Sequence, residues 1–270
     1  MKSLIKKIYY FFLKKFYSIF YKTLSVKQKQ LLSRTMFEVD KGNMTEGFLP
    51  LIHHKQELDD FKDDRINTSN PLKFEDLASL FASNNANHGI IGLTIRMSAY
   101  IYKVLNENNY KTAIDVGTHK GGSTILMSVA MGKDSKVHSI DLEDKENRLG
   151  SHRPYRDQLA NFKNKYNLNI IQYFGDSREI DLKFEQDEID CVLIDGGHEY
   201  EIVKNDYEKF GSKIRVGGSI FFDDCSDEGC FLKVKADQDY MKKLIKNLID
   251  SGKYKYHGNI DRLGHFVRIK

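Results

Sequence analysis

The stretch of sequence that decides the fold reads Thr112-Ala-Ile-Asp-Val-Gly-Thr-His-Lys-Gly-Gly-Ser-Thr-Ile-Leu126. Its largely apolar run from Ala113 to Val116 predicts a buried strand. The glycines that follow predict a tight turn, and a helical pattern begins at Ser123. This order brings backbone N–H groups to a helix N-terminus, where the helix dipole favours anions and close polar ligands.

The turn contains Gly117, Gly121 and Gly122, and glycine lets a ligand approach the backbone closely because it has no Cβ. The spacing Asp-x-Gly-x-x-x-Gly-Gly is neither the dinucleotide fingerprint Gly-x-Gly-x-x-Gly nor a Walker loop. Asp115, two residues before the first glycine, suits a neutral or cationic ligand better than a polyphosphate. The alternative interpretation is an ordinary turn between a strand and a helix, with no ligand.

The composition of the chain fits one α/β domain with an appendage: 270 residues, 40% hydrophobic and 30% charged. The net charge is +4, and nine lysines and arginines precede the first acid, Glu38. Because the remainder is close to neutral, no nucleic-acid surface is expected. Three cysteines fit a reducing compartment without a disulfide framework, which favours a cytoplasmic location.

Residues 1–34 predict a basic, aromatic, amphipathic helix. They contain no apolar run of the ~20 residues that a membrane span needs, and Lys14-Lys15 interrupts the only candidate core of a signal peptide. Two interpretations stay open. The helix lies on the inner face of an anionic membrane, or it packs on its own domain or on a partner subunit in a homo-oligomer.

Residues 35–87 predict a cap of helix and loop that includes a short amphipathic helix near Phe74 to Phe81. From Ile90 onward, strands and helices alternate. Strands are expected at 113–116, 136–141, 169–174, 189–194 and 217–222, helices at 90–105, 155–166, 202–210 and 239–251, and a closing hairpin at 254–257 and 265–269. This rhythm predicts an α/β fold: a Rossmann-like, doubly wound, mostly parallel seven-stranded sheet with a C-terminal antiparallel hairpin and an N-terminal helical extension.

Each of the five predicted parallel strands ends in an acid: Asp115, Asp141, Asp176, Asp195, and Asp223 with Asp224. In open parallel sheets, ligands bind beyond the carboxyl ends of the strands. Helix capping would use an aspartate at only some of these positions. The acids therefore are expected to meet at one rim and to need partners there: ligand hydroxyls, ligand amines or a metal ion.

This order of motifs resembles the class I S-adenosylmethionine-dependent methyltransferases over residues 88–270. More closely, it resembles the macrocin-type O-methyltransferases that act on sugars of antibiotics and surface glycans, together with the cephalosporin-hydroxylase-like group. The matching motifs are Asp115-Val-Gly-Thr-His-Lys-Gly-Gly122, Gly175-Asp-Ser177, Asp195-Gly-Gly-His-Glu-Tyr-Glu-Ile-Val-Lys-Asn-Asp206 and Gly217-Gly-Ser-Ile-Phe-Phe-Asp-Asp224.

The resemblance implies that the glycine turn contacts the methionine part of S-adenosylmethionine. It further implies that Asp141 binds both ribose hydroxyls and that the segment 175–177 holds the adenine. The expected cofactor-binding residues are Asp115, Gly117, Thr118, Gly121, Gly122, Ser123, Asp141, Asp176, Ser177 and Asp195.

The resemblance to metal-dependent members also implies that Asp195, Asp223 and Asp224 bind one Mg²⁺, which would orient and acidify a substrate hydroxyl. Catechol-type relatives carry a lysine base three residues after the first of these acids, and this chain has His198 there. His198, with Asp195, is the expected catalytic pair, since the ordinary pKa of histidine suits a base at neutral pH. A role for His198 in holding Asp195 in place stays equally open.

The sequence therefore predicts an S-adenosylmethionine-dependent, magnesium-assisted O-methyltransferase. The expected acceptor is a small molecule, a sugar of a surface glycan or glycolipid precursor. A nicotinamide-dependent oxidoreductase is disfavoured by the glycine spacing, and a catalytically inactive member of the fold is disfavoured by the acids at every strand end. A hydroxylase-like enzyme of the same fold stays open.

Overall fold

The computed structural model describes residue 23 and the ranges 72–80, 90–142, 153–197, 199–226, 229–230 and 240–270. Nearly all of the predicted helix at 1–34, most of the predicted cap at 35–87, and His198 lie outside these residues. The domain boundaries drawn from the sequence at 34 and 87 therefore stay predictions.

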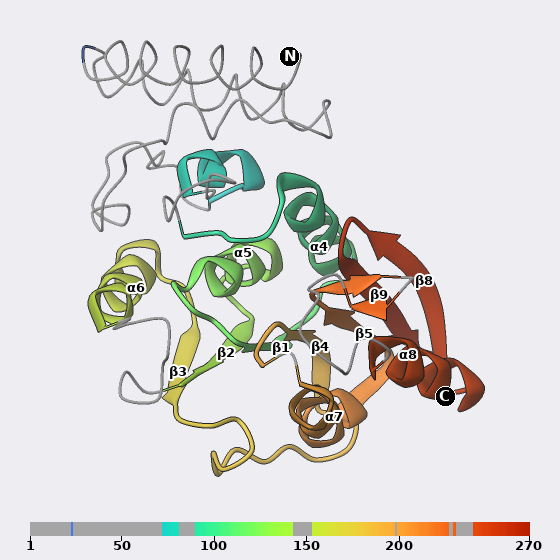
Figure 1. Cartoon of the computed structure of the whole chain (residues 1–270). Helices are drawn as coiled ribbons and strands as arrows, with labels where there is room; N and C mark the ends of the chain where they lie inside the picture. Colours follow the sequence, from blue (N-terminus) through green and yellow to red (C-terminus); the bar gives the residue numbers. More distant parts are fainter. Residues whose placement is uncertain are drawn as a thin grey trace, which may run out of the picture.

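A seven-stranded sheet with the order β3-β2-β1-β4-β5-β9-β8 forms the centre of the described structure (Figure 1). Neighbouring strands run parallel from β3 to β5, and β9 and β8 complete the sheet in antiparallel pairing. The strands are β1 (Thr112–Val116), β2 (Lys136–Asp141), β3 (Ile170–Phe174), β4 (Ile189–Ile194), β5 (Ile214–Phe222), β8 (Tyr254–Ile260) and β9 (Leu263–Arg268). This architecture confirms the predicted fold class.

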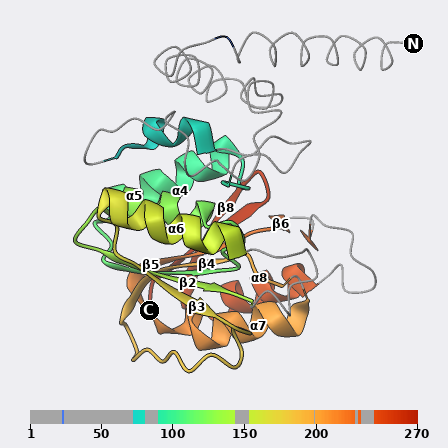
Figure 2. The same cartoon turned by 90° about the vertical axis from the view of Figure 1, so that its left-hand side faces the viewer.

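Helices cover both faces of the sheet: α4, α5 and α6 lie above it and α7 and α8 below it in Figure 2. Two 3-10 helices and a two-stranded pair, β6 with β7, complete the described elements. Their bounds are η2 (Phe74–Leu80), α4 (Ile95–Glu107), α5 (Gly122–Met131), α6 (Arg153–Tyr166), α7 (Tyr200–Lys209), η3 (Gly211–Lys213), β6 (Cys225–Ser226), β7 (Gly229–Cys230) and α8 (Tyr240–Asp250).

The hydrophobic core has two parts, one on each face of the sheet. Along β4, Cys191 and Leu193 belong to the part under α4, α5 and α6, whereas Val192 and Ile194 belong to the other. Successive side chains of a strand point to opposite faces, so both faces must be covered before such a strand can be apolar throughout. This is why the central strands read as continuous apolar runs.

The three largest differences from the predicted element boundaries have a physical reason. Helix α4 begins at Ile95 rather than at residue 90, because the Thr94 hydroxyl accepts a hydrogen bond from the Met97 amide at 3.2 Å and caps the helix. Strand β5 begins at Ile214, before its glycines: Gly217 has φ +82°, and the register with β4 shifts there. The glycine pair at which the sequence prediction began the strand is thus a bulge inside it.

The third difference is the closing hairpin, for which the sequence predicted a long loop over 258–264. In the structure Ile260 pairs with Leu263, so the chain turns at Asp261 and Arg262 alone. Gly258, with φ +88°, lies where the register between β8 and β9 shifts, and it bends the strand without ending it. The tight turn brings Arg262 to the end of the sheet where β5 ends.

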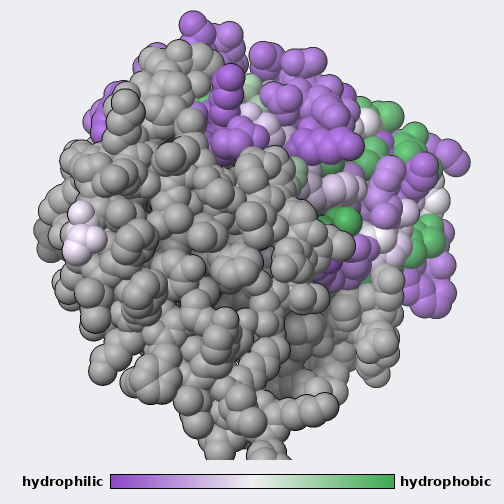
Figure 3. Space-filling model, turned by 90° about the horizontal axis from the view of Figure 1, so that it is seen from above, coloured by the Kyte–Doolittle hydropathy of each residue, from purple (hydrophilic) through white to green (hydrophobic). Residues whose placement is uncertain are grey.

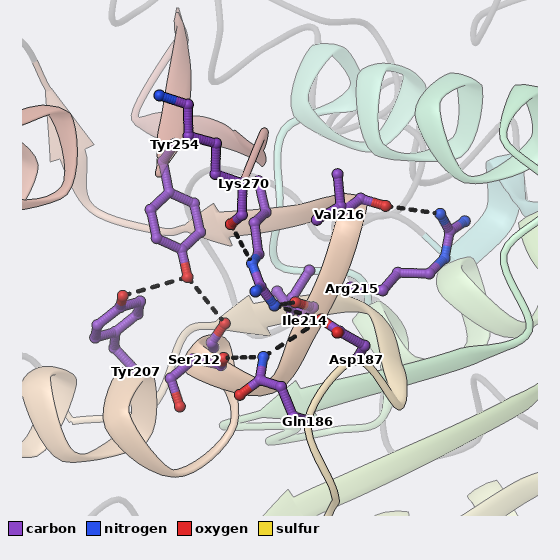
Figure 4. A network of polar contacts seen from close by, with 11 residues as sticks. Gln186, Asp187, Tyr207, Ser212, Ile214, Arg215, Val216, Tyr254 and Lys270 are labelled. Carbon is purple, nitrogen blue, oxygen red and sulfur yellow. Dashed lines mark hydrogen bonds and ion pairs between the residues drawn. The ribbon is translucent and has the colours of Figure 1, made fainter. Parts of the chain in front are cut away.

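The opposite, amino end of the sheet is held by polar contacts of Asp190. Asp190 accepts hydrogen bonds from the backbone amides of Lys111 (2.7 Å) and Thr112 (2.8 Å), and it pairs with Arg215. In Figure 4, Arg215 also reaches the Val216 carbonyl, at 3.0 Å. One buried carboxylate therefore joins the starts of β1 and β4 to β5.

None of the described helices combines the length and apolar character needed to cross a membrane. On the face seen in Figure 3, the coloured side chains are largely hydrophilic, with small hydrophobic groups among them. The large hydrophobic side chains that are exposed in the described structure are Leu142, Phe174, Val216, Ile249 and Ile269.

Replacing Asp190 by alanine should lower the free energy of unfolding by about 2–3 kcal/mol, because two partly buried backbone amides and Arg215 would lose their acceptor. Urea denaturation would measure this loss. The matched control is Asp250→Ala, whose carboxylate makes an exposed ion pair with Lys246 in α8 and should cost no more than about 1 kcal/mol. Equal losses in the two variants would contradict the role given to Asp190.

Candidate functional site

The carboxyl ends of β3, β2, β1, β4 and β5 form one continuous rim. Backbone hydrogen bonds join each strand end to the chain leaving its neighbour: Gly175 N to Asp141 O (2.8 Å), Gly117 N to Ile140 O (2.9 Å), Asp195 N to Val116 O (2.9 Å) and Asp223 N to Ile194 O (3.0 Å). The strand order reverses direction between β1 and β4. Open sheets bind their ligands at such a switch point, and all the predicted strand-end acids lie along this rim.

The glycine turn after β1 packs directly against the end of β4. A Cβ atom at Gly117 would lie 2.1 Å from the Asp195 carbonyl oxygen, and the φ angle of +91° also excludes most side chains there. Gly122 is equally constrained, since its Cβ would lie 2.1 Å from the Ile90 carbonyl oxygen. The turn thus fits between β4 on one side and residue 90 on the other only because it has no side chains at these positions.

Asp115 is fully buried beside the N-terminus of α5. Its Oδ2 accepts hydrogen bonds from Thr124 (2.5 Å), Ser123 (2.7 Å) and Thr118 (3.4 Å). Burial raises the pKa of Asp115 to about 6, against the lowering effect of the Thr124 and Ser123 hydroxyls. Its Oδ1 has no hydrogen-bond partner in the described part of the chain. That oxygen can accept a bond from a cationic or N–H-bearing ligand.

The expected ribose ligand, Asp141, ends β2 and is half-buried; its Oδ1 accepts a hydrogen bond from the Leu142 amide at 2.8 Å. Leu142 is 38% exposed, and Phe174, the register partner of Asp141 on β3, is 39% exposed. Two apolar side chains at adjacent strand ends can sandwich a flat ring. The sequence reasoning missed both, although each directly adjoins an expected site residue.

The expected adenine-binding residues, Asp176 and Ser177, both have partners within the protein. Arg178 donates to Asp176 from its Nε at 2.8 Å and lowers the pKa of that carboxyl. The Ser177 hydroxyl donates to Asp206 Oδ1 at 2.6 Å, and Lys209 Nζ donates to the Ser177 carbonyl at 2.6 Å. The loop after β3 is therefore held by α7.

Asp206 is a buried acid that the sequence reasoning quoted but gave no role. Burial raises its pKa to about 6, while the hydrogen bond from Ser177 lowers it. Its Oδ2 has no hydrogen-bond partner among the described residues. The one feature of the sequence that could have pointed to Asp206 is its position at the end of the motif that starts at Asp195.

The three expected metal ligands lie at neighbouring strand ends. Asp195 is half-buried, and desolvation of its carboxyl together with the adjacent Asp223 carboxylate raises its pKa well above the ordinary value. Asp223 and Asp224 are buried, and each forms an ion pair of 3.1 Å with Arg262. Arg262 was missed by the sequence reasoning, because it lies in what was expected to be a loop far along the chain.

These residues do not form a metal-binding cluster as they stand. Within the described part of the chain, no three histidine, cysteine, aspartate or glutamate side chains converge as ligands of one ion. Two of the three expected carboxylates are instead directed to the Arg262 guanidinium. His198, the expected base, lies outside the described residues. The contacts of this site therefore do not fit the predicted Mg²⁺, and no chemical step is derived through it.

Comparison with known proteins identifies the class. Residues 114–225 match the family model described as "Methyltransferase domain". A protein of Dictyostelium discoideum named "Probable caffeoyl-CoA O-methyltransferase 3" is 30% identical over 173 residues, which are 63% of this chain. The match spans 61% of the length of that relative.

Two solved structures share the fold. One, described as a candidate caffeoyl-CoA O-methyltransferase from Staphylococcus aureus, has a TM-score of 0.51 at 15% identity and covers 89% of this chain and 100% of its own. The other, a candidate O-methyltransferase from Klebsiella pneumoniae, has a TM-score of 0.50 at 11% identity and covers 90% and 100%. The resemblance to class I S-adenosylmethionine-dependent methyltransferases is confirmed, with residues 114–225 similar to a methyltransferase domain.

Gly117→Ala should weaken binding of S-adenosylhomocysteine at least tenfold, because the added Cβ would displace either the glycine turn or the end of β4. Isothermal titration calorimetry would measure the affinity. The matched control is Gly252→Ala: Gly252 also has a positive φ, +64°, but nothing lies within 4 Å of its Cβ position. Gly252→Ala should lower the free energy of unfolding by about 1–2 kcal/mol through backbone strain and leave the affinity for S-adenosylhomocysteine unchanged. A similar loss of affinity in both variants would refute the packing argument.

Asp206→Asn should remove a pH dependence of stability. The native pKa of Asp206, about 6, lies above the ordinary 3.8, so its stabilising contribution is complete below pH 3.8 and is lost as pH rises through about 6. The loss in wild type is on the order of 3 kcal/mol at most. Thermal unfolding between pH 4 and 7 should therefore show a flatter profile in the variant.

A second variant, with the opposite expected effect on the pH profile, checks the role given to Asp206. Ser177→Ala removes the hydroxyl that lowers the pKa of this carboxyl, so the decline of Tm with rising pH should become steeper than in wild type. Parallel pH profiles in wild type and both variants would show that Asp206 does not titrate in this range.

Proposed function

We propose that the protein is an O-methyltransferase that transfers a methyl group from S-adenosylmethionine to a hydroxyl of a small molecule. One observation carries the proposal: the side-chain-free turn at Gly117 meets the acidic end of β4 at Asp195, at the switch point of the sheet. A donor site and an acidic acceptor site are thereby adjacent. The family match over residues 114–225 and the Dictyostelium relative support the same reaction.

The donor side fits S-adenosylmethionine. The N-terminal amides of α5 and the unpartnered Asp115 Oδ1 suit the carboxylate and ammonium of its methionine part. Asp141 suits the ribose hydroxyls, and Leu142 with Phe174 offers apolar surfaces for the adenine. When bound, this cofactor supplies a methyl group activated by a cationic sulfonium.

The acceptor side is the end of β4 and β5. Asp195, whose raised pKa makes it a stronger base, and His198 are the proposed groups that take the proton of the acceptor hydroxyl. The remaining task of the protein is to align the hydroxyl with the methyl group and to exclude water. These are contributions of position, for which a rigid rim of hydrogen-bonded strand ends is suited.

The finer predictions from the sequence belong to this proposal as well. A sugar acceptor, membrane contact through residues 1–34, a cytoplasmic location and a homo-oligomer remain predictions. The predicted Mg²⁺ assistance is not part of this proposal, because Asp223 and Asp224 pair with Arg262. The name of the Dictyostelium relative points to a second acceptor class, a phenolic hydroxyl of a thioester. The hydroxylase-like alternative also stays open, while the glycine spacing continues to argue against a nicotinamide cofactor.

The first test is cofactor binding. Isothermal titration calorimetry should show S-adenosylhomocysteine binding to wild type, and Asp141→Asn should weaken it by roughly tenfold or more, since hydrogen bonds to a charged acceptor contribute about 1.5–3 kcal/mol. Asp134→Asn, an exposed acid at the other end of β2, is the matched control and should bind as wild type does. Binding of NAD⁺ in place of S-adenosylhomocysteine would overturn the proposal.

The acceptor requires a separate assay with methyl-labelled S-adenosylmethionine. A panel should contain free sugars, nucleotide sugars, lipid-linked glycans and caffeoyl-CoA. Transfer to a sugar supports the prediction from the sequence, and transfer to caffeoyl-CoA alone favours the second acceptor class. Cofactor binding without transfer to any hydroxyl, but with oxidation of an acceptor, would favour the hydroxylase-like alternative.

A further inference from the structure

We propose that Arg262 is the resident cation of the acidic site and takes the place that a divalent metal ion would have between Asp223 and Asp224. This inference rests on the proposed function only in treating the ends of β4 and β5 as the acceptor side. It assigns a role to a residue of the C-terminal hairpin and makes the site independent of metal.

The two terminal guanidinium nitrogens of Arg262 form ion pairs with two different carboxylates. One terminal nitrogen of Arg262 lies 3.1 Å from Asp223 Oδ2, and the other lies 3.1 Å from Asp224 Oδ1. The two aspartate side chains are 3% and 2% exposed, whereas that of Arg262 is 29% exposed. The guanidinium therefore lies over the buried acid pair and closes it toward solvent.

The backbone around Arg262 holds this arrangement in place. The Arg262 carbonyl accepts a hydrogen bond from the Cys225 amide at 2.7 Å, directly after the acid pair. Asn259, three residues before Arg262, donates to the Cys225 carbonyl at 2.5 Å. The hairpin turn is thus bonded to the segment that carries Asp223 and Asp224.

The other side of the turn is fixed to α4. Asp261 accepts hydrogen bonds of 2.7 Å from both the Thr94 hydroxyl and the Arg96 guanidinium. Thr94 is the cap of α4, so the turn is attached to a helix end as well as to the strand end. A side chain mounted on a turn with two such attachments is positioned in advance, which favours a structural pairing over a chance contact.

Electrostatics explains why such a cation is needed. Two adjacent buried carboxylates are costly to ionise without a partner. A divalent ion or a guanidinium can supply the charge, and the fixed donors of arginine match two oxygens at once. Both cations would use the same oxygens, and they repel each other. With Arg262 bound there, and no three described ligands converging, the site has its cation already.

Direct metal binding tests the proposal. The probe is Mn²⁺, added to the full chain and followed by electron paramagnetic resonance of the free ion. Wild type should show no saturable binding below about 1 mM, the weak end of protein sites for hard divalent cations. Arg262→Gln should free the carboxylates and bind Mn²⁺ at least tenfold more tightly. Adding Asp224→Asn to that variant should abolish the gain.

The matched control is Lys246→Gln, which also removes one positive charge, but from an exposed ion pair with Asp250 in α8 instead of the acid pair. Its Mn²⁺ titration should equal that of wild type. Stoichiometric binding in wild type that Asp224→Asn removes would overturn the proposal. So would unchanged, weak binding in a folded Arg262→Gln variant, because the guanidinium would then not be what keeps the metal out.

Folding and function are checked separately. S-adenosylhomocysteine binding should be retained in wild type, Lys246→Gln and Arg262→Gln, and its absence in wild type would refute the proposed function without touching the metal result. If Arg262→Gln does not fold, Arg262→Lys replaces it, because a single ammonium group cannot pair with both carboxylates as the two terminal nitrogens of arginine do. Arg262→Lys should then bind Mn²⁺ more tightly than wild type, and unchanged, weak binding in that folded variant would overturn the proposal.

Discussion

Buried carboxylates at the carboxyl rim of the sheet need partners, and much of the geometry of the site follows from how each finds one. Asp115 is met by hydroxyls of α5, Asp176 by Arg178, and the pair Asp223 and Asp224 by Arg262. Ionised groups removed from water are stable only with such compensation. Each of these acids is therefore stabilised by a partner from a different part of the fold.

These partners differ in whether they leave a carboxylate oxygen available to a ligand. Asp115 keeps one oxygen without a partner in the described structure, so the donor side retains an acceptor for a ligand. At the acceptor side, the guanidinium of Arg262 already occupies the acid pair. The two sides meet at Gly117 and Asp195, where close backbone contact leaves no space for a side chain. A methyl donor and its acceptor would thus meet where the chain is closely packed.

The two ends of the sheet have separate tasks. At the amino end, Asp190 and Arg215 satisfy backbone groups and each other, which stabilises the strand starts. At the carboxyl end, acids with raised pKa values, among them Asp115 and Asp206, keep atoms without hydrogen-bond partners in the described structure. Such groups reduce stability, and they are expected where a protein binds ligands.

The sequence by itself determined the order of strands and helices, the glycine turn after β1 and the acid at the end of each parallel strand. Local patterns are sufficient for these, because apolar periodicity and glycine act over a few neighbouring residues. Only the tertiary structure decided which side chains pair: Asp206 with Ser177, and Arg262 with Asp223 and Asp224. It also decided the bulge at Gly217. The Arg262 pairing depends on β9 lying beside β5 and on the tight turn at Asp261, and no local pattern specifies which distant segments become neighbours in a sheet.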